Sequence, residues 1–141
     1  MTSDAAIDID ALRPILASVV APWVAELDLQ LQDARRGEVV LALPVSAQLV
    51  HGGGVLCGQS MMAAADTAMI LAVCTLLGEF KPMTTVQLQT SFLRPVAGDS
   101  GAARVAARVL RMGRKLVFGE IHLYDAQGEL AAHATTTYAL L

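Results

Sequence analysis

Residues 58–77 read GQSMMAAADTAMILAVCTLL, a nearly uninterrupted apolar stretch whose length and composition predict one long buried helix. A single charged side chain, Asp66, stands near its middle. A carboxylate held among apolar groups without partners costs several kcal/mol, so such a group faces a polar cavity or changes its protonation. Asp66 is therefore the first candidate functional residue.

The composition around this helix predicts one domain that associates with copies of itself. The 141 residues suffice for a single core spanning 1–141. Hydrophobic residues make up 55% of the chain and charged residues 16%, which is more apolar than a small soluble monomer needs and indicates a buried subunit interface. A net charge of −3 and the absence of a basic run argue against nucleic acid as a partner.

The cysteines and the N-terminus indicate a cytoplasmic protein. Cys57 and Cys74 lie in or beside the same helix, too far apart to bridge within one subunit, so we expect reduced thiols. Three aspartates precede the first Lys or Arg, unlike the basic start of a secretory signal. Residues 60–77 are marginal in length for a membrane span and carry a central carboxylate, so we expect no membrane partner.

The remaining elements follow from hydrophobic periodicity and turn residues. We expect an N-terminal helix over 9–25, with Pro14 in its first turn, as part of a helical extension over 1–25. In residues 86–92 the side chains at Val86, Leu88, Thr90 and Phe92 alternate with polar ones, as in a half-buried strand. The predicted strands are 27–33, 38–43, 86–93, 102–111, 115–124 and 130–140.

These elements predict an α+β fold. The last four strands form an antiparallel meander, and the curved antiparallel sheet wraps around the one long central helix to bury it. The N-terminal helix is then an extra covering element.

The helix start offers a second candidate group. Gly58 opens the helix, where N–H groups lack intrahelical partners and the helix dipole is positive, so this end can hold a developing oxyanion. Asp66 lies eight residues further on, about 12 Å away at 1.5 Å per residue. One reacting carbonyl cannot touch both, so if both groups act on it they come from different subunits of a dimer.

Four segments carry a family resemblance. Residues 51–68, HGGGVLCGQSMMAAADTA, resemble the loop-and-helix signature of hotdog-fold acyl-CoA thioesterases of the PaaI-like group. Residues 84–95, TTVQLQTSFLRP, resemble the strand that follows the central helix in that group, and MGRK at 112–115 and AHATTTY at 132–138 resemble its later segments. The resemblance covers about 25–141 and implies a hotdog fold.

The resemblance also implies an activity and a set of site residues. It implies hydrolysis of an acyl-CoA or acyl carrier protein thioester, with an aryl or short to medium acyl group, to acid and thiol. Asp66 would attack the carbonyl or activate water, Gly58 would donate its N–H to the carbonyl oxygen, and Thr85 would lie near the water. His51 takes the place of a common Asn or Gln. The substrate-binding candidates are Cys57, Gln59, Met62, Thr84, Arg94, Arg114 and Lys115.

Partners and cofactors follow in the same way. The resemblance implies no metal or redox cofactor, coenzyme A being part of the substrate, and a homotetramer made from two dimers. No spacing of His, Cys, Asp and Glu predicts a metal site. His122 alternates outward with Glu120 on a predicted strand, so we expect a solvated or interface role for it and for His133.

Two other functions stay open. A hotdog dehydratase or hydratase would pair His51 with Asp66 for proton transfer, although the prolines that usually surround that histidine are absent. A non-catalytic acyl-CoA binding module would use the same groove without turnover. Asp66 itself can also be a structural residue that bonds to a neighbouring strand.

Overall fold

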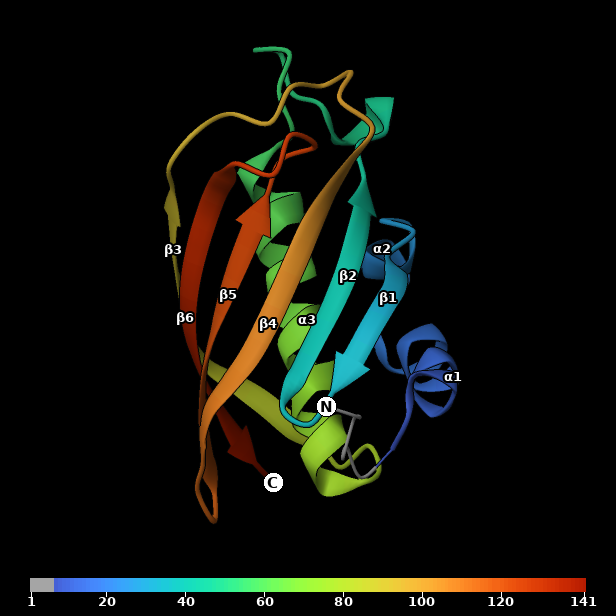
Figure 1. Cartoon of the computed structure of the whole chain (residues 1–141), viewed down its shortest axis with the longest axis vertical. Coiled ribbons are helices and arrows are strands. Elements are labelled where there is room, and N and C mark those ends of the chain that lie inside the picture. The colour runs from blue at the N-terminus through green and yellow to red at the C-terminus, as the bar shows by residue number, and fades with distance from the viewer. Residues whose placement is uncertain (1–6) are drawn as a thin grey trace.

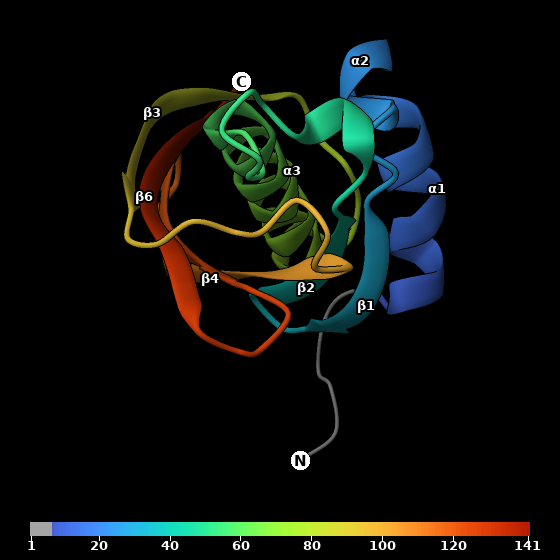
Figure 2. The same ribbon diagram turned by 90° about the horizontal axis from the view of Figure 1, so that it is seen from above.

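The computed structural model describes residues 7–141, and one long helix, α3 (Gly58–Leu77), lies at its centre. A six-stranded antiparallel sheet curves around that helix (Figure 1). Seen from above, the strands enclose α3 on one side, while the helix α1 (Ile9–Val19) lies outside the strand β1 (Gln30–Arg35) (Figure 2). The predicted architecture is therefore confirmed. Residues 1–6, with Asp4 and the start of the expected N-terminal extension, lie outside the described residues.

The central helix owes its position to small apolar side chains. Ala64, Ala68 and Ala72 are fully buried, which lets the sheet approach closely. At Gly119 in β5 (Leu116–Tyr124) an added Cβ would overlap the end of the Met69 side chain and lie 2.9 Å from the carbonyl oxygen of Arg108, so glycine lets the helix and the neighbouring strand approach this point closely. Gly78 ends the helix in the left-handed conformation, φ 84°, and donates its N–H to the carbonyl of Cys74.

The same helix has the length and apolarity of a membrane span. However, 67% of its most apolar stretch of 18 residues is buried inside the protein, so in this structure it is the core helix. The expectation of no membrane helix agrees with this position.

The strand order differs from the predicted one. The sheet runs β1-β2-β4-β5-β6-β3, so β3 pairs with β6 and only β4, β5 and β6 form a meander. The loop after β3 crosses the start of α3, where Leu56 N–H donates to Val96 O at 2.8 Å, and delivers β4 beside β2. The strands other than β5 are β1 (Gln30–Arg35), β2 (Glu38–Pro44), β3 (Met83–Phe92), β4 (Ala102–Met112) and β6 (Leu130–Leu140).

The predicted N-terminal helix over 9–25 is two helices. α1 (Ile9–Val19) ends before Pro22, because the residue that precedes a proline is driven to extended backbone, and Ala21 has ψ 151°. α2 (Pro22–Ala25) is a single turn. Pro14 lies beyond the first turn of α1, not within it as expected, and it is exposed.

Strand β3 is an edge of the sheet and is irregular. A bulge between Thr85 and Gln87 shifts the alternation, so Val86 is 60% exposed instead of half-buried. Phe92 is also exposed, at 48%, while Leu88 packs against the core as predicted. Exposed apolar residues therefore lie on the open edge strand.

Candidate active site

Two hydroxyl groups hold the carboxylate of Asp66. Thr85 Oγ1 donates to Asp66 Oδ1 at 2.8 Å, and the Tyr138 hydroxyl donates to the same Oδ1 and to the Asp66 backbone carbonyl, the latter at 2.9 Å. Thr85 and Tyr138 face each other in register on β3 and β6. Because both donors converge on Oδ1, neither of these bonds uses Oδ2, and the side chain is fixed while half-buried.

Tyr138 is the site residue that the sequence reasoning missed. Only 1% of it is exposed, and burial, followed by the charge of Asp66, raises the pKa of its phenol. Tyr138 is therefore a neutral donor throughout the physiological range. Tyr138 lies in the predicted strand 130–140. Its role depends on the pairing of this strand with Thr85 on β3, and that pairing could not be predicted from the sequence.

Gly58 lies at the first position of α3, as predicted. Cys57 before it is extended, φ −70° and ψ 146°, so the helix and its unpaired N–H groups begin at this point. An added Cβ on Gly58 would lie 3.1 Å from the Phe92 ring. A groove of about 410 Å³ opens here, lined by His51, Val55, Leu56, Gly58, Met61 and residues 92–95.

His51 borders this groove but does not meet Asp66. Gly53 N–H donates to His51 Nδ1 at 2.8 Å, so the neutral ring carries its proton on Nε2. The ring is exposed, and it lies at the helix start whereas Asp66 lies about two turns along the helix. Within one chain the structure therefore brings Asp66 to Thr85 and His51 to Gly58, but it does not bring the two pairs together.

The other predicted substrate residues are spread over three regions. Cys57 and Gln59 line a separate hollow of about 220 Å³ with Trp23. Met62 is partly buried on α3, and Thr84 is exposed on β3 beside the inward Thr85. These side chains surround the helix start and the edge strand.

The basic candidates differ in their neighbours. Arg94 contacts two carboxylates, Glu129 Oε2 at 3.4 Å and Asp125 Oδ2 at 3.9 Å. Arg114 and Lys115 are exposed in the β4–β5 turn, at the end of β4 away from the loop that crosses the helix start. One chain alone therefore does not gather these cations around Gly58.

The structure brings together one group of possible metal ligands that the spacing along the sequence did not predict, while the expectation of no bound metal stays a prediction. Glu120, His122 and His133 come together on the sheet, with their possible ligand atoms all within 4.8 Å of one another. This group lies apart from Asp66. The cross-strand pairing of β5 with β6 brings the residues together, and their spacing along the sequence does not reveal it.

A family model described as "Thioesterase superfamily" matches residues 48–132, a span that includes Gly58, Asp66 and Thr85. The chain belongs to this superfamily.

Individual relatives agree with this assignment. A protein of Thermoplasma volcanium, provisionally named as an esterase, is 31% identical over 75% of this chain and 77% of its own length. The PaaI protein of the Escherichia coli phenylacetic acid degradation operon superposes with a TM-score of 0.81 at 20% identity, over 94% of this chain and 91% of that one. A hypothetical thioesterase of Streptococcus pneumoniae, solved with coenzyme A, superposes with a TM-score of 0.73 at 18% identity, over 80% of this chain and 85% of that one. The predicted hotdog fold and the membership in a thioesterase family are confirmed.

Proposed function

We propose that the protein is an acyl-CoA thioesterase whose active site combines Asp66 of one subunit with Gly58 of the partner subunit. The observation that carries the proposal is the paired donation of Thr85 and Tyr138 to one oxygen of the Asp66 carboxylate. A purely structural aspartate has no need for an oriented second oxygen, whereas a nucleophile or general base does. Membership in the thioesterase superfamily supports the same chemistry.

The proposed reaction consumes one water and cleaves one C–S bond. Oδ2 of Asp66 either attacks the thioester carbonyl carbon or takes a proton from the attacking water. The N–H of Gly58 stabilises the negative charge on the carbonyl oxygen, since donors at a helix start are oriented before the reaction begins. The tetrahedral intermediate then expels the thiolate, which is protonated to CoA. If water attacked, the acyl group leaves at once as the free acid. If Asp66 attacked, the acyl group first forms a mixed anhydride with its carboxylate, and water then hydrolyses this anhydride to the free acid and regenerates Asp66.

A dimer across the open edge of the sheet fits this arrangement. Strand β3 pairs with β6 on one side only in the described chain, and it presents Val86, Phe92 and Leu93, which are 48–60% exposed. Apolar side chains on an unpaired edge favour association with another copy. A two-fold axis there would place the start of one α3 near the middle of the other. The family resemblance extends this to a homotetramer of two such dimers.

The substrate class follows from the groove at the helix start. Its volume of about 410 Å³ and its lining by Met61, Phe92 and Leu93 suit an aryl or a short to medium acyl group. Arg114 and Lys115 are our choices for the CoA phosphates, while Arg94 is already occupied by two carboxylates. We place this reaction in the cytoplasm, where Cys57 and Cys74 stay reduced.

The test is release of free thiol from a panel of aryl-CoA and acyl-CoA esters of increasing chain length. Asp66→Asn keeps the size of the side chain but removes its basicity, so turnover should fall at least a thousandfold. Asp99→Asn, the same change on an exposed loop residue, is the matched control and should keep wild-type rates. Readings without substrate correct for the protein's own thiols.

The alternatives give different products. A dehydratase would form an enoyl thioester without releasing thiol, and a binding module would bind CoA esters with equal affinity in the wild type and Asp66→Asn. The Nδ1 contact of His51 with Gly53 counts against a histidine base at that nitrogen. No thiol release from any ester by the folded wild type would refute the thioesterase.

Mixing two inactive variants tests the shared site. Asp66→Asn and Gly58→Pro are each expected to be inactive as homodimers. After subunit exchange, half of the dimers are mixed and each mixed dimer has one intact site, so about a quarter of wild-type activity should return. If mass spectrometry shows mixed dimers and activity stays at zero, the two groups do not come from different subunits.

A further inference from the structure

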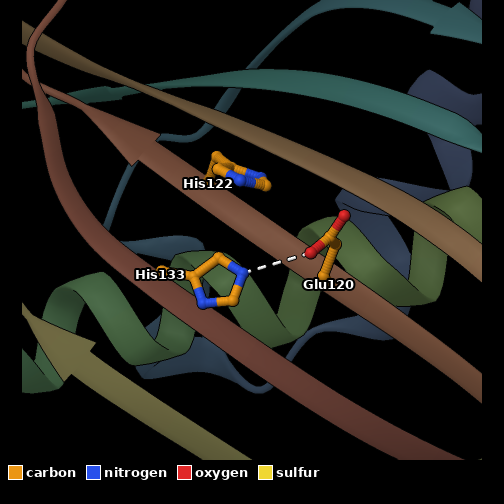
Figure 3. A group of neighbouring side chains, drawn as sticks. All are labelled: Glu120, His122 and His133. Carbon is orange, nitrogen blue, oxygen red and sulfur yellow. Dashed lines mark hydrogen bonds and ion pairs between the residues drawn. The ribbon is translucent and has the colours of Figure 1, made fainter.

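Three side chains with metal-binding atoms meet on the outer face of the sheet. His122 on β5 and His133 on β6 are direct cross-strand partners, and their ring centroids are 4.8 Å apart. Glu120 lies two residues before His122 and points to the same face, with its Oε2 3.1 Å from His133 Nε2. Figure 3 shows the three side chains together on neighbouring strands.

We propose that Glu120, His122 and His133 bind a divalent transition-metal ion of the zinc class. Two imidazoles and one carboxylate form a ligand set that zinc accepts, with a fourth position open to water. Bonds of about 2.1 Å in a tetrahedral site put ligand atoms about 3.4 Å apart. The ligand atoms here lie within 4.8 Å of one another, so each pair has to approach by no more than about 1.4 Å, the difference between 4.8 and 3.4 Å, to close the site.

The surroundings leave room for an ion. The cross-strand neighbours on the two outer sides are small, Ala106 opposite His122 and Ser91 opposite His133. A groove of about 470 Å³ reaches Glu120 and His122 from the side of β4. The ion can therefore enter from the outer face without moving the backbone.

The local charge balance also favours a cation. Three carboxylates, Asp33, Glu38 and Glu120, line the groove against two guanidinium groups, Arg35 and Arg108.

Arg108 supports the Glu120 carboxylate from the side of β4. Its Nη2 donates to Glu120 Oε1 at 2.9 Å, which orients the carboxylate and leaves Oε2 directed at His133. Partners that orient a ligand from behind are typical of metal sites. Glu38 on β2 is the cross-strand partner of Arg108, so its negative charge offsets the positive charge of Arg108.

This site is separate from Asp66. Ile121 and Ala134, the neighbours of the histidines along their strands, are 1% and 3% exposed and face α3, so the histidines point the other way. Tyr138 on the same strand β6 faces inward to Asp66. Metal binding is therefore expected to be independent of the Asp66 carboxylate.

Titration calorimetry with Zn²⁺ and the visible spectrum of bound Co²⁺ test the proposal on the full chain in a thiol-free reductant. We expect one ion per chain with micromolar affinity, and at least tenfold weaker binding in His122→Asn and in His133→Asn. Glu120→Gln should weaken binding similarly. His51→Asn, Cys57→Ser and Asp66→Asn are the controls and should bind as the wild type does.

Two results would overturn the site. One is the absence of binding by the folded wild type at millimolar Zn²⁺. The other is binding that survives both sheet-histidine substitutions, or that disappears in Cys57→Ser or His51→Asn, because the ion would then be held elsewhere. Circular dichroism confirms folding of each variant, so that loss of binding is not loss of structure.

Discussion

Tyr138→Phe removes one oxygen atom, the donor to both the carboxylate and the backbone carbonyl of Asp66. A hydrogen bond to a charged acceptor is worth about 1.5 to 3 kcal/mol. If that stabilisation orients the reacting carboxylate, its loss lowers kcat/KM by about 10- to 150-fold. The ring stays in place, so the free energy of unfolding should fall by no more than the value of the lost bond, about 1.5 to 3 kcal/mol.

The assay is thiol release across pH 5 to 9, with kcat and KM measured separately. We expect the loss in kcat rather than in KM, because a carboxylate that is no longer aligned slows the reaction without weakening the binding of the ester. Tyr124→Phe is the matched control, because Tyr124 has no contact with Asp66. The guanidinium carbon of Arg104 lies over its ring, 4.7 Å from the ring centroid. A folded Tyr138→Phe protein with the kcat and kcat/KM of the wild type would refute the reasoning.

Two further substitutions separate catalysis from stability. Gly58→Pro should retain the fold, because proline is accepted at the first helical position and Cys57 is already extended. It should nevertheless lower kcat at least a hundredfold, because it removes the N–H group. The control Gly58→Ala keeps this N–H and should lose far less activity. Burial raises the pKa of the Cys74 thiol from 9.0 to about 11. Between these two values the thiol ionises in the unfolded chain but stays neutral in the folded chain. The folded state therefore keeps its full stability below pH 9 and loses stability as the pH rises to about 11. Urea unfolding should therefore show a steeper decline over this window for the wild type than for Cys74→Ala, and equal slopes would contradict it.

Hydrophobic periodicity was enough to predict the helix and most strands. The long helix over 58–77 and its enclosing sheet follow from one apolar segment that a small domain has to bury. The break at Pro22 was readable, because the rule for the residue before proline applies to Ala21. The strand order was not readable, because the crossing of the loop after β3 over the helix start depends on contacts such as Leu56 with Val96.

The candidate site was predictable where it depended on local sequence and not where it depended on register. Asp66 is conspicuous as a charge inside an apolar helix, but Tyr138 acquires its role only through pairing with Thr85. In the same way, His122 meets His133 only because β5 and β6 pair in this register, which includes a shift near Tyr124. A slip of one residue would send one ring to the opposite face.

The bulge in β3 affects both the exposed edge of the sheet and the hydrogen bonding of Asp66. It turns Val86 outward onto the sheet edge and keeps Thr85 turned inward to the carboxylate of Asp66. An edge strand held on one side frays more easily than a central strand. If the protein forms the dimer proposed above, a subunit separated by dilution would lose alignment of its own carboxylate as well as the half of the site that its partner supplies. Backbone amide hydrogens around Thr85 would then exchange faster in the separated subunit than in the dimer.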